Sequence, residues 1–93
     1  MIVAQVIGTV VATKKHELLR GKKIQIVQPL DGKSLDPCGQ TFVAIDAVGA
    51  GSGEQVLVVQ GSGARQGADL DSIPVDATIV GIIDQLDISS RTE

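Results

Sequence analysis

The stretch Asp46–Arg65, DAVGAGSGEQVLVVQGSGAR, joins a glycine-rich turn, a continuous apolar run and a second glycine-rich turn. Five of the eleven glycines of the chain fall within this stretch. Such density predicts a backbone that takes positive φ angles or approaches other backbone closely. The apolar run inside Gln55–Gln60 is typical of a strand that is buried on both faces. The function of the chain therefore depends on whether the two turns hold a ligand, catalyse a reaction or contact another subunit.

The first turn, Gly49 to Gly53, superficially matches a nucleotide-binding loop. A dinucleotide fingerprint places its third glycine three residues after the second, where this chain has Glu54, and a helix must follow. Here an apolar strand pattern follows, and no Gly-Lys-Ser/Thr sequence ends the turn as it would in a P-loop. The sequence therefore argues against nucleotide binding at this turn.

The second turn, residues 61–67, follows a strand pattern and contains Arg65. Backbone N–H groups in such a turn could bind an anion with help from the guanidinium. The alternative is a structural turn in which Arg65 pairs with a carboxylate or a carbonyl group. Both readings stay open, so one function hypothesis is a small anion- or ligand-binding barrel that uses Ser62, Ala64 and Arg65.

The rest of the chain predicts an all-β fold, a small five-stranded OB-like β-barrel with one short helix. Gly8 and Gly81 interrupt the first and last strands, where they predict bends or bulges. Alternation in the first strand predicts one small, apolar face made of Ile2, Ala4, Val6, Gly8, Val10 and Ala12. The expected strands are residues 2–13, 22–30, 41–47, 55–60 and 76–88, and the expected helix lies within 62–73.

Length and composition favour a single domain, residues 1–93, that associates with other subunits. The chain is 43% hydrophobic but has one aromatic residue, Phe42, so its core must be aliphatic. A domain of 93 residues buries a modest share of its surface, and association is the simplest way to bury more. The net charge of −3 argues against nucleic acid as a partner, because phosphate neutralisation needs a concentrated basic face.

No set of residues predicts catalysis, a cofactor or a metal site. The single cysteine, Cys38, and the single histidine, His16, have no partner group that would orient them as a nucleophile pair. Asp46, Asp76 and Asp84 are expected to cap turns or to pair with a neighbouring subunit. The N-terminus resembles neither a secretory signal nor a membrane span, so we expect a cytoplasmic protein with no membrane partner.

Four stretches together resemble the pentameric vertex shell proteins of bacterial microcompartments, the carboxysome and ethanolamine-utilisation type. They are IGTVVAT at 7–13, LRGKKI at 19–24, AIDAVGAGSGEQVLVVQGSGAR at 44–65 and PVDATIVGIIDQLD at 74–87. The resemblance implies an OB-like barrel that forms a homopentamer, catalyses no reaction and closes the vertices of an icosahedral shell. It also implies hexameric and trimeric shell proteins as partners. Gln55 and Gly63 depart from the residues that many relatives carry at those positions.

The resemblance further implies a narrow opening at the centre of the ring, lined by small polar and glycine-rich loops. Gly49, Ala50, Gly51 and Ser52 are the residues expected at that opening. The full set of pore or interface candidates is Gly49, Ala50, Gly51, Ser52, Glu54, Ser62, Arg65 and Asp76.

Overall fold

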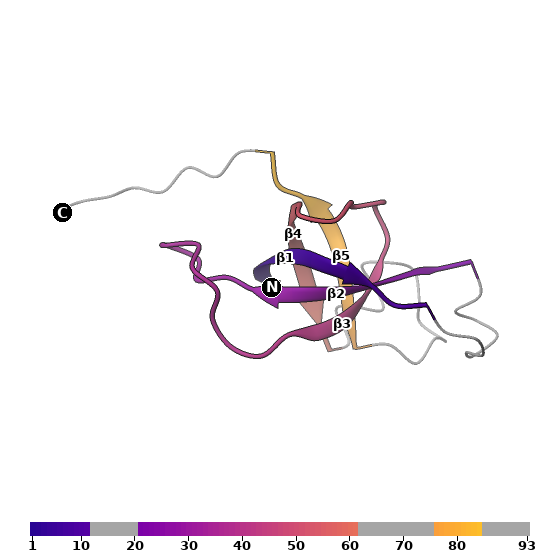
Figure 1. Ribbon diagram of the computed structural model, residues 1–93, viewed down its shortest axis with the longest axis horizontal. Coiled ribbons are helices and arrows are strands. Elements are labelled where there is room, and N and C mark those ends of the chain that lie inside the picture. The colour runs from indigo at the N-terminus through magenta and orange to yellow at the C-terminus, as the bar shows by residue number, and fades with distance from the viewer. Residues whose placement is uncertain (12–20, 62–75, 85–93) are drawn as a thin grey trace.

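The computed structural model describes residues 1–11, 21–61 and 76–84, which form a closed five-stranded barrel (Figure 1). The strands pair in the order β1-β2-β3-β5-β4, and β4 returns to β1. All pairs are antiparallel except β3 with β5, which is parallel. The predicted five-stranded barrel is thus confirmed. The strands are β1 (Ile2–Thr9), β2 (Lys23–Pro29), β3 (Phe42–Asp46), β4 (Gln55–Gln60) and β5 (Ala77–Ile82).

The predicted strands agree with the observed ones in order and position, and they differ at their ends. The fourth strand has the predicted bounds, whereas the first ends at Thr9 and the fifth at Ile82. The expected helix within 62–73, like the predicted extensions over 12–13 and 85–88, lies outside the described residues. Within the described residues, no helix is long and apolar enough to span a membrane.

A β-bulge in β1 changes which side chains face the barrel interior. Val6 pairs with Val27, Gly8 pairs with Ile26, and Ile7 is the extra residue between them. The strand therefore reverses its faces: Ala4 and Val6 point inward, but Gly8 lies on the outer side. The prediction of a bulge at Gly8 is confirmed. The prediction that Gly8 shares the inner face with Val6 is wrong, because the extra residue shifts the alternation by one.

A second bulge bends β5 at the position predicted from Gly81. Leu57 pairs with Gly81 and Val58 with Ile79, which leaves Val80 as the extra residue. A Cβ atom at Gly81 would lie 3.5 Å from Cδ1 of Leu57, so the leucine side chain covers the space that the glycine leaves open. The two bulges lie in the strands that flank β4, in a sheet that must curve to close.

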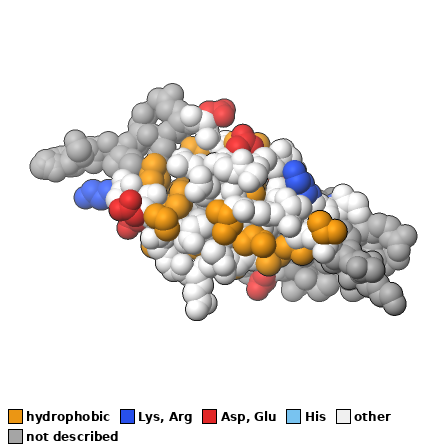
Figure 2. Space-filling view, viewed as in Figure 1, with side chains coloured by type: hydrophobic (Ala, Val, Ile, Leu, Met, Phe, Trp, Pro, Cys, Tyr) orange, Lys and Arg blue, Asp and Glu red, His pale blue; other side chains and the backbone are white. Residues whose placement is uncertain are grey.

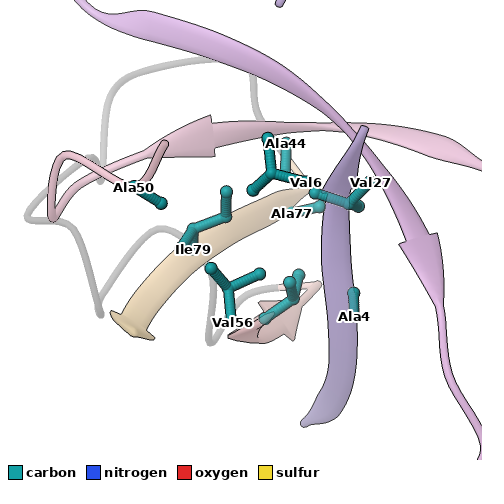
Figure 3. Packing of buried hydrophobic residues seen from close by; sticks show 9 residues of the cluster. Ala4, Val6, Val27, Ala44, Ala50, Val56, Ala77 and Ile79 are labelled. Carbon is teal, nitrogen blue, oxygen red and sulfur yellow. The ribbon is translucent and has the colours of Figure 1, made fainter. Parts of the chain in front are cut away.

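The core of the barrel is aliphatic, as the composition predicts (Figure 3). Its largest fully buried apolar side chains are one isoleucine, Ile79, and four valines. Phe42, the single aromatic residue, is partly buried and packs against this cluster. The buried cluster consists of Ala4, Val6, Val27, Ala44, Ala50, Val56, Val58, Ala77 and Ile79.

Two kinds of buried polar side chain accompany this core. Gln25 and Asp46 are buried and hydrogen-bonded to each other. Thr78 is fully buried, and its Oγ1 is the one buried side-chain polar atom in the described part of the chain with no hydrogen-bond partner. In the sheet Thr78 pairs with Ile45 and with Val59, which are both apolar.

Candidate functional site

The connection from β3 to β4, residues 47–54, contains most of the predicted site residues. It runs back over the barrel from the end of β3 to the start of β4 (Figure 1). Asp76 lies at the other end of β4, where its carbonyl oxygen accepts a hydrogen bond of 2.8 Å from the N–H of Gly61. Ser62 and Arg65 lie outside the described residues. The structure therefore brings together Gly49, Ala50, Gly51, Ser52 and Glu54.

The carboxylate of Asp46 determines the first half of this connection. It is 8% exposed, and its Oδ1 accepts hydrogen bonds from the N–H groups of Val48 (2.9 Å) and Gly49 (2.8 Å). Its Oδ2 accepts a third backbone hydrogen bond, of 2.7 Å, from Ala50. An Asp side chain that accepts from the following residues is a common turn device. This confirms the capping role that we expect for Asp46.

Gln25 fixes the same turn from inside the barrel. Its side chain is 1% exposed, and its Nε2 donates to Oδ2 of Asp46 (3.1 Å) and to the carbonyl of Ala50 (2.8 Å). Its Oε1 accepts a hydrogen bond of 2.8 Å from Oγ1 of Thr9. The Nζ of Lys23 donates to the same Ala50 carbonyl at 3.2 Å. These bonds satisfy the buried amide and connect the turn to β1, β2 and β3.

Ala50 anchors the connection by its methyl group rather than lining a surface. It is 0% exposed and belongs to the core cluster, and Figure 3 shows it directed toward Ile79. The expectation that the Ala50 side chain lines an opening or contacts a neighbour is therefore corrected. The cause is the Asp46 cap, which turns the backbone so that this alanine enters the barrel.

The second half of the connection is bound to β1. The N–H of Gly53 donates to the carbonyl of Val6 (2.8 Å), and the N–H of Val6 donates to the carbonyl of Glu54 (3.0 Å). Nε2 of Gln5 adds a bond of 3.0 Å to the carbonyl of Gly53. Oε1 of Glu54 accepts a bond of 2.6 Å from the N–H of Gly51. Both halves of the turn are thus fixed to barrel strands.

Two glycines of the turn have backbone conformations that other residues rarely adopt. Gly49 has φ of +82° and Gly53 has φ of +89°, as the glycine density predicts. Gly51 has no positive φ, and a Cβ there would lie 3.5 Å from Oε1 of Glu54, an ordinary contact. The turn therefore needs glycine at its two ends for conformation, and not at its middle.

The polar groups of the turn are largely used in hydrogen bonds that hold its own backbone. Both oxygens of Asp46 accept hydrogen bonds from protein donors, so this carboxylate is committed to structure. Among the described residues, no group of three or more His, Cys, Asp or Glu side chains could hold a metal ion. The turn exposes the apolar residues Ala47 and Val48, and beside them Gly49, Ser52, Gly53 and the side chain of Glu54.

Sequence reasoning missed the residues that hold this turn from the barrel. Gln25 lies between Ile24 and Ile26, and alternation alone favours placing the isoleucines inside. The structure places Gln25 inside, beside Asp46, and the two isoleucines on the outer side. An available signal was Asp46 itself, since a buried carboxylate at a strand end needs a buried donor opposite it.

The structure is thus a small closed barrel whose 47–54 turn is hydrogen-bonded to β1, β2 and β3. Residues 1–84 match the family described as "Ethanolamine utilisation protein EutN/carboxysome". The chain belongs to this family of bacterial microcompartment shell vertex proteins, which are structural proteins and not enzymes.

Individual relatives agree with this assignment. The microcompartment shell vertex protein GrpN of Rhodospirillum rubrum is 48% identical over 94% of this chain and 97% of its own length. The carboxysome shell vertex protein CcmL of Synechocystis is 47% identical over 97% of this chain and 89% of its own.

Solved structures are similar over almost the whole chain. An ethanolamine utilisation protein EutN matches with a TM-score of 0.89 at 42% identity, covering 96% of this chain and 92% of its own. The structure described as the GrpN pentameric microcompartment shell protein from Rhodospirillum rubrum matches with a TM-score of 0.84 at 45% identity. It covers 95% of this chain and 99% of its own.

Proposed function

We propose that this chain, a microcompartment shell vertex protein that forms pentamers, closes the vertices of a shell whose facets are hexameric and trimeric shell proteins. The observation that carries the proposal is the match to vertex proteins over nearly the full length of both chains. A pentamer fits this task because five copies around one axis occupy a point at which five facets meet. The direct contact with hexameric and trimeric shell proteins is the part that goes beyond the family assignment.

The turn over residues 47–54 is the proposed site of assembly or of the central opening. Its support is rigidity: the Asp46 carboxylate and the bonds to β1 give each copy the same backbone conformation. A fixed turn loses little conformational entropy when it is packed against a neighbour. The candidates in this turn that reach the surface are Gly49, Ser52 and Glu54, which are exposed, and Gly51, which is partly exposed. Ser62, Arg65 and Asp76 remain proposed interface residues.

Native mass spectrometry of the purified chain tests the assembly, and the expected species is a pentamer at micromolar concentration. A monomer or a dimer as the main species would refute the vertex function. Co-expression with the hexameric and trimeric proteins of one shell then tests the partners. Closed shells should form with this chain, and shells with open vertices should form without it. Electron micrographs that show equally closed shells in both cases would contradict the proposed contact.

A substitution at Ser52 distinguishes between the two roles proposed for the turn, lining the central opening and contacting a neighbouring subunit. If Ser52 lines the central opening, Ser52→Trp should leave the pentamer intact and narrow the opening in a cryo-electron microscopy map. If Ser52 lies between subunits, the same substitution should dissociate the ring. Ser34→Trp, the same exchange at an exposed residue in a connection for which no interface is proposed, is the matched control and should alter neither property.

A further inference from the structure

We draw no further inference here: the strongest candidate, the largely exposed 31–38 loop between β2 and β3, which lies among the white and orange side chains of Figure 2 and in which Leu35 is the one non-glycine residue of the described chain with a positive φ, carries nothing, because nothing in the structure shows what would contact it.

Discussion

Two connections of this barrel begin with the same device, an aspartate that accepts hydrogen bonds from the backbone that follows it. In residues 31–38, Oδ1 of Asp31 accepts from the N–H groups of Lys33 (2.8 Å) and Ser34 (2.9 Å). In residues 46–54, Oδ1 of Asp46 accepts from the residues two and three positions later, at 2.9 and 2.8 Å. The two bonds to Oδ1 are thus the same in both turns, and the turns differ in the further bonds and in what surrounds them.

The Asp31 turn projects away from the barrel, whereas the Asp46 turn lies against it (Figure 1). Asp31 is exposed, and its bonds stay within its own loop. Asp46 is buried and also binds Gln25, and the Ala50 that follows it enters the core. The same short motif thus holds only its own loop in one place, and in the other it positions a residue of the hydrophobic core, Ala50. Only the tertiary environment distinguishes them.

The largest effect is expected from removing the buried cap. Asp46→Ala leaves the N–H groups of Val48, Gly49 and Ala50 without their acceptor. We expect the free energy of unfolding to fall by about 3 kcal/mol, since the N–H of Ala50 and the amide of Gln25 are buried donors that lose this acceptor. Urea denaturation measures this change. The matched variant is Asp31→Ala, which should move the denaturation midpoint far less, and equal losses would contradict the comparison.

A smaller loss should follow from alanine at the end of the buried turn. Gly53 has φ of +89°, so Gly53→Ala introduces backbone strain and should lower the free energy of unfolding by about 1–2 kcal/mol. Gly51→Ala is the control in the same turn, because φ at Gly51 is not positive and its Cβ would make an ordinary contact. Thermal melts of both variants test the difference, and similar midpoints would show that the turn is not held as described.

A gain in the free energy of unfolding is expected at Thr78, because its buried hydroxyl, unlike the Asp46 carboxylate, has no hydrogen-bond partner. Oγ1 of Thr78 is buried without a hydrogen-bond partner, between neighbours that are apolar. Thr78→Val has nearly the same shape, removes the desolvated hydroxyl, and should raise the free energy of unfolding by about 1 kcal/mol. Thr41→Val, at an exposed residue, controls for the general effect of the exchange. A loss of stability in Thr78→Val would mean that the hydroxyl does bind a partner.

The smallest effect is expected at Asp31, the exposed cap, where the contribution of its carboxylate to the free energy of unfolding should depend on pH. The backbone N–H groups of Ser34 and Lys33 stabilise the charged carboxylate and lower the pKa of Asp31. The folded pKa lies below the unfolded pKa, so this contribution to stability is present above the unfolded pKa. It is lost as the pH falls through the folded pKa. An NMR titration of Asp31 should show the lowered pKa, and Ser34→Pro, which removes one donor, should raise it.

The order of strands and the aliphatic core could be predicted from the sequence, because β-branched runs separated by glycine and turn residues are local signals. The inner and outer faces could not be predicted throughout. The bulge at Ile7 adds one residue to one strand, and this moves Gly8 from the expected inner side to the outer side. The glycine indicates a bulge, but which residue is the extra one depends on pairing with β2, which is not visible in β1 alone.

The site could be predicted only in part, because some of its features depend on strands that are distant in sequence. The glycines that need a positive φ, Gly49 and Gly53, follow from local sequence. The burial of Ala50 and the role of Gln25 do not, because they depend on the turn folding back onto strands that are distant in sequence. Neighbouring residues specify the turn itself, and the rest of the barrel specifies where it packs.

The parallel pairing of β3 with β5 has a consequence for the time at which this barrel can form. β5 lies between β3 and β4, so the two strands that flank it are synthesised first and have no pairing with each other in the barrel. Until β5 has left the ribosome, both strands keep an unpaired edge. The barrel therefore closes after the synthesis of its last strand, and closure requires β5 to pair with the distant β3, for example Thr78 with Ile45. Ring assembly must wait for that step, because an open sheet does not present the same surface as a closed one.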